Sequence, residues 1–269
     1  MTGSGNDFVM FDARDEPPGA LETPAVIQAV CARGTGVGAD GVVFLEPPTR
    51  AGTHFRMRYF NRDGSCGAAC GNATLCITRL AAILGAAPAE EMRIESDTGI
   101  LHTRLVAQHP EVELQPVHRV SPSVEIAREP QERRAGFALA GVPHLVVLCD
   151  DVERIDVAHR GAQLRRDAVL GEDGANVDFV SPRPTERGAG WSMRTYERGV
   201  EAETLACGTG AIATAVLLST WDESTTSTTM ETRSGRELRV TLRQCAEGWL
   251  PSLSGEGRLV YTGELHDAG

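Results

Sequence analysis

The sequence predicts an α+β protein built from two homologous halves. Two cysteines, Cys70 and Cys207, stand in nearly the same setting, Ala-Cys-Gly followed by a polar residue. Each closes an extended segment and opens an apolar run of helical length. Further landmarks recur in the same order before each cysteine. Together these observations indicate an internal duplication.

The duplicated landmarks have nearly equal spacing. Steps of 34, 21 and 9 residues lead from Asn6 to Asp40, Asn61 and Cys70, and steps of 32, 21 and 10 lead from His144 to Asn176, Glu197 and Cys207. Four matched landmarks in one order are hard to reach by chance. We therefore expect two domains of ordinary size, residues 1–115 with 259–269 returning to them, and residues 116–258.

In the first half, strands are predicted where β-branched and aromatic residues cluster or alternate with polar residues. These strands are Phe8–Asp12, Gly41–Glu46, His54–Phe60, Arg93–Glu95, Leu101–Val106 and Glu111–Leu114. A helix is expected over Thr23–Arg33, with Pro24 at its first position. A second, apolar helix is expected over Cys70–Leu84, ended by Gly85.

The second half repeats this order. The same signals predict strands at Leu145–Cys149, Val177–Val180, Trp191–Tyr196, Thr228–Thr232, Glu237–Leu242 and Arg258–Tyr261. Helices are expected within Val152–Leu170 and over Cys207–Ser219. Each cysteine helix is apolar almost all round, which predicts a buried central helix. The segment 115–134 is interpreted as the crossover and 181–190 as a polar surface loop.

The composition of the chain excludes several classes of function. The chain has 269 residues and a net charge of −11, which argues against a nucleic-acid partner. No apolar run reaches the roughly 20 residues that span a membrane. No basic stretch followed by an apolar one opens the sequence, so we expect no signal peptide. Seven cysteines, an odd number, form no disulfide framework. A reducing cytoplasm fits this use of cysteine best.

The chain contains no lysine. A pyridoxal phosphate enzyme holds its cofactor as a lysine Schiff base, so that mechanism is excluded. A phosphate-binding P-loop also needs its own lysine. The glycine-rich segment 34–41 follows a helix and precedes a strand, the reverse of a dinucleotide fingerprint. We expect no cofactor and interpret this segment as a loop lining a cleft.

The two cysteines suggest acid–base chemistry. A thiol at a helix start lies at the positive end of the helix dipole, which favours the thiolate. The glycine after each cysteine, Gly71 or Gly208, lets backbone N–H groups approach a carboxylate. Two such thiols facing one cleft could remove a proton from one face of an α-carbon and return one to the other. The alternative is that both cysteines are small buried apolar residues.

His144 and Glu197 are candidates to assist the thiols, since a resting base must be a thiolate and a nearby base can activate it. Their counterparts in the first half are Asn6 and Asn61, so only the second half carries ionisable groups there. Either residue alone would more often be a surface or capping residue. Asn176 and Arg198 could grip a second polar group of a small-molecule substrate.

A metal site is the competing interpretation of Cys66, Cys70 and Cys76. Zinc sites usually combine two close pairs of ligands, and no second pair or nearby histidine follows here. We therefore expect no metal. Cys31, Cys149 and Cys245 lie in apolar or strand contexts and are interpreted as inert.

Seven motifs resemble the diaminopimelate epimerase family, and they are spread over essentially the whole chain. They are Gly-Ser-Gly-Asn-Asp-Phe at 3–8, Gly-Ala-Asp-Gly at 38–41, Phe-Asn-Arg-Asp-Gly-Ser at 60–65, Cys-Gly-Asn at 70–72, Pro-His at 143–144, Tyr-Glu-Arg-Gly at 196–199 and Glu-Thr-Leu-Ala-Cys-Gly-Thr-Gly at 203–210. The resemblance implies two pseudo-symmetric domains, each a strongly curved mixed sheet wrapped around a central helix. It also implies a homodimer and a cofactor-independent epimerase that interconverts LL- and meso-diaminopimelate.

The resemblance also implies roles for individual residues. Cys70 and Cys207 would form the acid–base pair, with His144 and Glu197 assisting them. The reacting carboxylate would be held by Gly71, Asn72, Gly208 and Thr209. The rest of the amino-acid substrate would be read by Asn6, Asn61, Asn176 and Arg198.

Several positions depart from the family pattern. Val142 replaces an asparagine before Pro-His, segment 73–75 is altered, and one residue is added between Glu197 and Cys207. A racemase of another amino acid with the same cysteines therefore stays open, as does a non-catalytic thiol protein that binds metal. The family has a short strand before the segment at 2–6, so we expect that Met1 is not the true start or that this strand is absent.

Overall fold

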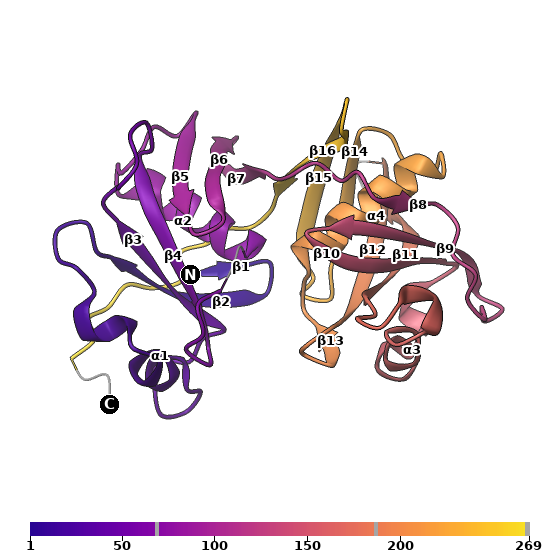
Figure 1. Cartoon of the computed structure of the whole chain (residues 1–269), viewed down its shortest axis with the longest axis horizontal. Helices are drawn as coiled ribbons and strands as arrows, with labels where there is room; N and C mark the ends of the chain where they lie inside the picture. The colour runs from indigo at the N-terminus through magenta and orange to yellow at the C-terminus, as the bar shows by residue number, and fades with distance from the viewer. Residues whose placement is uncertain (68–69, 186–187, 267–269) are drawn as a thin grey trace. The chain divides into compact units, whose positions relative to one another are not determined.

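The protein is described by a computed structural model that covers residues 1–67, 70–185 and 188–266 (Figure 1). It divides into two units, Met1–Glu113 with Ser254–Gly269, and Leu114–Leu253. Each unit is an α+β structure in which a mixed sheet packs on a buried helix, as the sequence predicts. Among the described residues, no helix combines the length and the apolar character needed to cross a bilayer.

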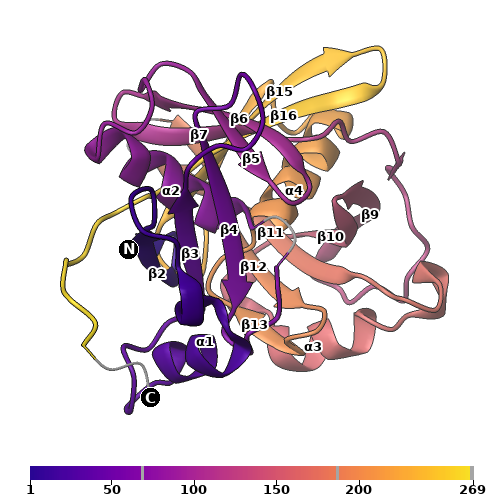
Figure 2. The ribbon, with the colours of Figure 1, turned by 60° about the vertical axis from the view of Figure 1, so that its left-hand side comes forward.

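The first unit contains seven strands and two α-helices among its described residues. The strands are β1 (Thr2–Gly3), β2 (Asn6–Asp12), β3 (Gly41–Glu46), β4 (Phe55–Asn61), β5 (Met92–Ser96), β6 (Gly99–Val106) and β7 (His109–Glu113), and the helices are α1 (Pro24–Cys31) and α2 (Gly71–Ile83). The strands follow one another in sequence order across the sheet. Strands β2 and β3 are parallel, whereas β3 and β4 are antiparallel and lie side by side in Figure 2.

Strand β3 shows why this sheet is covered on both faces. All six of its residues are buried, which is typical of a strand packed from two sides. Val43 and Leu45 pack with residues of α2, while Val42 and Phe44 pack with residues of α1. Helix α2 also contacts β1, β2, β6 and β7 and is therefore the central helix of the unit.

The second unit has the same plan. Its strands are β8 (Val120–Ser121), β9 (Glu132–Ala140), β10 (Val142–Cys149), β11 (Asn176–Thr185), β12 (Gly188–Glu197), β13 (Ala202–Thr204), β14 (Ser227–Glu231), β15 (Glu237–Cys245) and β16 (Gly248–Ser254), and its helices are α3 (Val157–Leu164) and α4 (Gly208–Thr220). The pairing from β9 to β15 alternates antiparallel, parallel, antiparallel, parallel and antiparallel. The pairing from β1 to β6 follows the same alternation.

Helix α4 is the central helix of the second unit. All nine residues from Gly210 to Leu218 are buried. The helix contacts β9, β10, β11, β14 and β15. The prediction that both cysteine helices are buried is confirmed.

Two predicted segments are wrong. Segment 181–190 is not a polar loop, because β11 and β12 pair from Val177–Tyr196 as far as Thr185–Gly188, with residues 186–187 outside the described chain. Strand β10 pairs with β11 only as far as Val180. Pro182 and Pro184 therefore lie where that edge of β11 has no β10 partner, a position that tolerates proline.

The expected strand at Arg258–Tyr261 does not form. Arg258 and Thr2 exchange two backbone hydrogen bonds of 2.9 Å, and residues 259–266, the described part of the chain beyond this isolated bridge, have no assigned strand. Val260 and Tyr261 are exposed, so their β propensity finds no sheet face to pack on. Strands β9 and β16 lie outside the segments predicted from sequence.

Candidate active site

Each of the two cysteines occupies the N-cap of its central helix. Helix α2 begins after Cys70 and helix α4 begins after Cys207, and both helices have 13 residues. The cap dihedrals are nearly the same, with φ and ψ of −112° and 114° at Cys70 and −132° and 110° at Cys207. The first turn of each helix leaves backbone N–H groups without helical partners, a setting that suits an anion.

The second unit builds a hydrogen-bonded chain around Cys207. The Cys207 Sγ lies 3.4 Å from the Thr209 Oγ1, and the Thr209 Oγ1 lies 3.0 Å from the His144 Nε2. The His144 Nδ1 lies 2.7 Å from the Asp178 Oδ2. A carboxylate can only accept, so Nδ1 carries the proton and Nε2 of a neutral ring is left as an acceptor.

Asp178 is a site residue that the sequence prediction missed. Its carboxylate is fully buried and accepts a second hydrogen bond of 2.7 Å from the Thr195 hydroxyl. Asp178 and Asn176 are two residues apart on β11 and therefore point to the same face. A lone aspartate in the apolar run from Val177 to Val180 was the signal that could have identified it.

Asn176 joins this group from the first residue of β11, which pairs with His144 of β10. The Asn176 Nδ2 lies 3.5 Å from the His144 Nε2, and its Oδ1 accepts a 2.7 Å hydrogen bond from the Arg198 backbone N–H. The structure therefore brings together His144, Asn176, Thr209 and Cys207, with Arg198 attached through its backbone.

Burial changes the expected charge of Cys207. Desolvation raises the pKa of this thiol, with further contributions from the Glu197 and Asp178 carboxylates, while the Thr209 hydroxyl and the Gly210 N–H oppose the rise. The expectation that the helix start favours a thiolate is thus not met at Cys207 in this environment, because desolvation outweighs the helix N–H groups. Burial also raises the pKa of Glu197.

The surroundings of Cys70 in the first unit are different. Asn6 and Asn72 are in contact, since the Asn72 Nδ2 donates a 2.7 Å hydrogen bond to the Asn6 Oδ1. Asn61 makes other contacts, accepting from the Tyr59 hydroxyl at 2.9 Å and donating to the Ser65 Oγ at 3.0 Å. Cys70 itself is half-buried.

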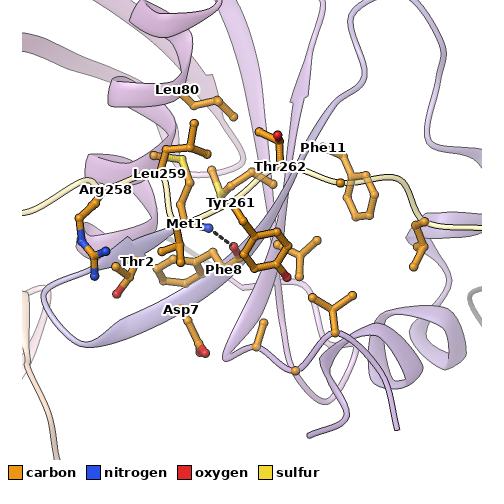
Figure 3. Close-up of a pocket in the computed structure, with 18 of the residues that line it drawn as sticks. Met1, Thr2, Asp7, Phe8, Phe11, Leu80, Arg258, Leu259, Tyr261 and Thr262 are labelled. Atoms are coloured by element: carbon orange, nitrogen blue, oxygen red, sulfur yellow. Dashed lines mark hydrogen bonds between the residues drawn. The ribbon is translucent and has the colours of Figure 1, made fainter. Parts of the chain in front are cut away.

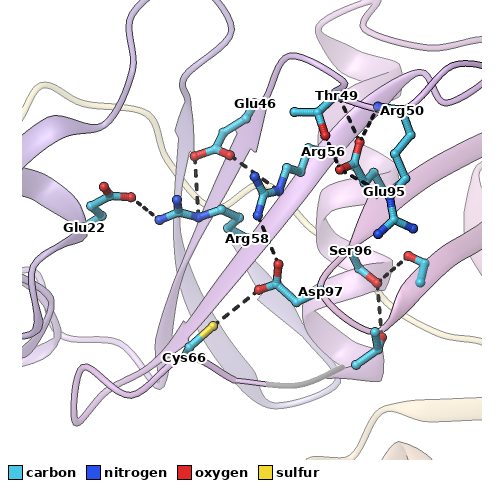
Figure 4. Close-up of polar contacts among 12 residues, drawn as sticks. Glu22, Glu46, Thr49, Arg50, Arg56, Arg58, Cys66, Glu95, Ser96 and Asp97 are labelled. Atoms are coloured by element: carbon cyan, nitrogen blue, oxygen red, sulfur yellow. Dashed lines mark hydrogen bonds and ion pairs between the residues drawn. The ribbon is translucent and has the colours of Figure 1, made fainter.

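The two cysteines closest to Cys70 in sequence, Cys66 and Cys76, lie in different surroundings, since Cys66 is exposed and Cys76 is buried. The Cys66 thiol donates a 3.4 Å hydrogen bond to Asp97, at the end of an ion-pair network that includes Arg56, Arg58 and Glu46 (Figure 4). Cys76 is fully buried, and desolvation raises its pKa to about 12. Among the described residues, no group of three or more His, Cys, Asp or Glu side chains is placed to hold a metal ion.

A cavity of about 690 Å³ in the first unit lies apart from Cys70 (Figure 3). Its walls come from Met1, Thr2 and β2, from Arg33 and residues 37–39, from Leu80 of α2 and from residues 258–265. The Met1 amino group donates a 2.7 Å hydrogen bond to the Phe8 carbonyl at its edge. Since neither Cys70 nor Asn72 lines it, this cavity does not form part of the cysteine site.

Solved structures share this fold. A phenazine biosynthesis protein of the PhzF family from Bacillus anthracis superposes with a TM-score of 0.73 at 13% identity, covering 95% of this chain and 91% of that one. A hydroxyproline epimerase from Agrobacterium vitis superposes with a TM-score of 0.58 at 17% identity, covering 90% and 79%. At these identities the likeness concerns the fold of two pseudo-symmetric domains.

Sequence comparison gives the class and the family. Diaminopimelate epimerases from Gemmatimonas aurantiaca and Aquifex aeolicus are 47% and 36% identical to this chain, covering 98% and 81% of it and 97% and 79% of their own lengths. The family model for diaminopimelate epimerase matches residues 1–120 and 137–248. The chain is an isomerase of the amino-acid epimerase class. It belongs to the diaminopimelate epimerase family.

Proposed function

We propose that this enzyme inverts the α-carbon of diaminopimelate, converting the LL form to the meso form without a cofactor. Cys70 and Cys207 act as the two bases. The observation that carries the proposal is their shared place at the N-cap of a buried 13-residue helix in two units of the same strand order. The 47% identity to a diaminopimelate epimerase supports this substrate and a role in lysine and cell-wall precursor synthesis.

The reaction moves one proton off the α-carbon and one back. One cysteine, as thiolate, takes the α-proton, and the other, as thiol, delivers a proton to the opposite face of the carbon. The carbanion needs stabilisation, which charge-assisted hydrogen bonds to the α-carboxylate can supply. Those bonds come from the helix starts at Gly71, Asn72, Gly208 and Thr209. Asn6, Asn61, Asn176 and Arg198 bind the rest of the substrate.

The contacts around His144 supply a route for forming the Cys207 thiolate. The Cys207 S–H proton passes to the Thr209 oxygen as the Thr209 hydroxyl proton passes to the His144 Nε2. The products are a thiolate and an imidazolium, and the Asp178 carboxylate stabilises the imidazolium through Nδ1. Glu197 assists the opposite step, because its carboxylate raises the pKa of the Cys207 thiol and so favours the protonated form that acts as the acid.

A racemase of another amino acid is the second candidate, because Val142 stands where the family pattern has an asparagine. Val142 is the first residue of β10, two residues before His144, and is only half-buried. An apolar side chain there removes one polar contact that a substrate with two polar ends could use.

Proton exchange in heavy water tests both candidates. The purified enzyme is incubated in D₂O with LL-diaminopimelate, meso-diaminopimelate, proline, hydroxyproline, glutamate and alanine, and loss of each α-proton signal is followed by NMR. We expect exchange and inversion with diaminopimelate only. Exchange of another amino acid alone would contradict the substrate, and exchange of none would contradict the function. Zinc analysis of the same preparation tests the metal-binding alternative.

A further inference from the structure

A three-residue ionic clasp lies next to the Asn6–Asn72 pair in the first unit. Arg33 donates two hydrogen bonds to the Asp7 carboxylate, at 2.7 and 3.0 Å, and one to the Asp40 carboxylate at 2.9 Å. The Asp40 backbone N–H donates to Asp7 at 3.0 Å, and the Asp7 backbone N–H donates to Asp40 at 3.3 Å. The clasp, defined as Asp7, Arg33 and Asp40, thus ties the start of β2 to the loop before β3.

The clasp is connected to the start of α2 by two side-chain amides. The Asn6 Nδ2 donates a 3.0 Å hydrogen bond to the Asp40 Oδ2, and the Asn72 Nδ2 donates to the Asn6 Oδ1. Asp7 makes no such link to an asparagine side chain among the described contacts. Asp40 is therefore the carboxylate at which this amide chain ends.

The Asp40 carboxylate decides which way the Asn6 and Asn72 side-chain amides are oriented. An ionised carboxylate accepts hydrogen bonds only, so Asn6 must turn its NH₂ group toward Asp40. Its oxygen then faces Asn72, which must in turn offer its own NH₂ group. The Asn72 Oδ1 is consequently directed away from Asn6 and takes no part in this row of hydrogen bonds.

That oxygen has no hydrogen-bond partner among the described residues, although it is buried. Asn72 is only 4% exposed and lies in the first turn of α2, two residues after Cys70. An unsatisfied buried acceptor is costly and calls for an explanation such as a ligand that meets it. A ligand for this acceptor must carry an N–H or O–H donor.

We propose that Asp40, held by Arg33, is a positioning residue that fixes both amides and so keeps the Asn72 Oδ1 ready to accept from an ammonium group of the substrate. The identity of that substrate rests on the function proposed above, whereas the orientation of the two amides follows from the hydrogen bonds alone. Without the carboxylate, an amide at position 40 could offer either its oxygen or its NH₂ group, and both asparagines could turn over.

Asp40→Asn tests the proposal, with Asp7→Asn as the matched control. Each variant removes one carboxylate that accepts hydrogen bonds from Arg33. Only Asp40→Asn also allows the Asn6 and Asn72 side-chain amides to turn over. We expect Asp40→Asn to raise KM for the amino acid about tenfold, the size of one lost hydrogen bond, with kcat changed less than about threefold. Asp7→Asn should leave KM within about twofold. Equal KM values in the two variants would overturn the proposal.

A second readout does not depend on activity. In protein labelled with ¹⁵N at asparagine, the side-chain NH₂ resonances of Asn72 should shift in Asp40→Asn and stay in place in Asp7→Asn. Asn72 does not touch Asp40, so a shift there reports a change passed through Asn6. Unchanged Asn72 resonances in Asp40→Asn would overturn the inference, whether or not the enzyme is active. If the wild-type enzyme turned over no amino acid, that result would count against the proposed function alone.

Discussion

The starts of helices α2 and α4 are built on the same backbone but carry different chemistry. Both place a cysteine at the N-cap of a buried helix. Around Cys207 the neighbouring side chains are His144, Asp178 and Thr209, which can move a proton. In the first unit, Asn6 and Asn72 lie near the corresponding helix start and can only orient hydrogen bonds. The duplicated helix starts thus share the thiol position, while the side chains described beside it differ in chemistry between the two units.

The largest expected effect comes from removing either thiol. Cys70→Ala and Cys207→Ala should each lower epimerisation by about 10³-fold or more, since each step needs its own acid or base. α-Proton exchange and inversion are measured by NMR in D₂O. Cys245→Ala, which changes a half-buried cysteine of the second unit, serves as the control. Full activity in either active-site variant would refute the two-base mechanism.

Asp178→Asn tests whether the ionisable side chains beside Cys207 in the second unit contribute to catalysis. The amide keeps the shape of the side chain but can no longer stabilise an imidazolium, so kcat should fall about 100-fold. The variant should still fold, because the amide oxygen can accept from the His144 Nδ1–H while the amide NH₂ group donates to the Thr195 hydroxyl oxygen. Circular dichroism and the melting temperature check folding, and a wild-type kcat would show that the His144–Asp178 contact is only structural.

Gly210→Ala tests why the third helix residue differs between the units. A Cβ at Gly210 would lie 2.3 Å from the Asp178 Oδ1, so this carboxylate must move. The corresponding residue of α2 is Ala73, which is fully buried and already carries a Cβ. We expect Gly210→Ala to cost about 1–3 kcal/mol of unfolding free energy and to lower kcat. Ala73→Gly should cost about 1 kcal/mol.

Denaturant unfolding measures both of these variants. If Gly210→Ala were as stable and as active as the wild type, the close approach of Asp178 to α4 would not constrain this position.

Thr209→Val removes the hydroxyl between the thiol and the imidazole while keeping the volume of the side chain. The loss of this hydrogen-bonding group should lower kcat about tenfold. Thr209→Ser keeps the hydroxyl and should retain most activity. Equal kcat values for the two variants would show that the proton does not pass through this oxygen.

The smallest effect concerns the reactivity of the resting thiols. Cys207 is 7% exposed and its pKa is raised by burial, whereas Cys70 is half-buried. Because the thiolate is the nucleophile, iodoacetamide should label Cys207 about tenfold more slowly than Cys70 at neutral pH. Labelling of Cys207 should rise with pH well beyond the range of an ordinary thiol. Peptide mass spectrometry distinguishes these sites from the exposed Cys66, and faster labelling of Cys207 would contradict the expectation.

The sequence located much of the fold because the signals are local. Pro24 starts α1, the apolar run after each cysteine becomes a central helix, and strand β3 has the bounds that its β-branched run predicts. The loop expected at 181–190 is wrong because the polar residues up to Thr185 pair with the adjacent strand β12, so polarity does not prevent a hairpin here. The strand expected at Arg258–Tyr261 is wrong because Val260 and Tyr261 are exposed and find no sheet face to pack on.

The sequence by itself determined the duplication, with His144 and Asn176 among its landmarks, and the two cysteine helix starts, since motif order and spacing are properties of the chain. The tertiary structure alone decided that Asp178 reaches His144, that Thr209 lies between His144 and Cys207, and that Asp40 directs Asn72 through Asn6. Each of these networks joins side chains more than 30 residues apart in sequence. Such contacts form only when parallel strands and a central helix pack together, so their geometry follows from packing and is not written in any one segment.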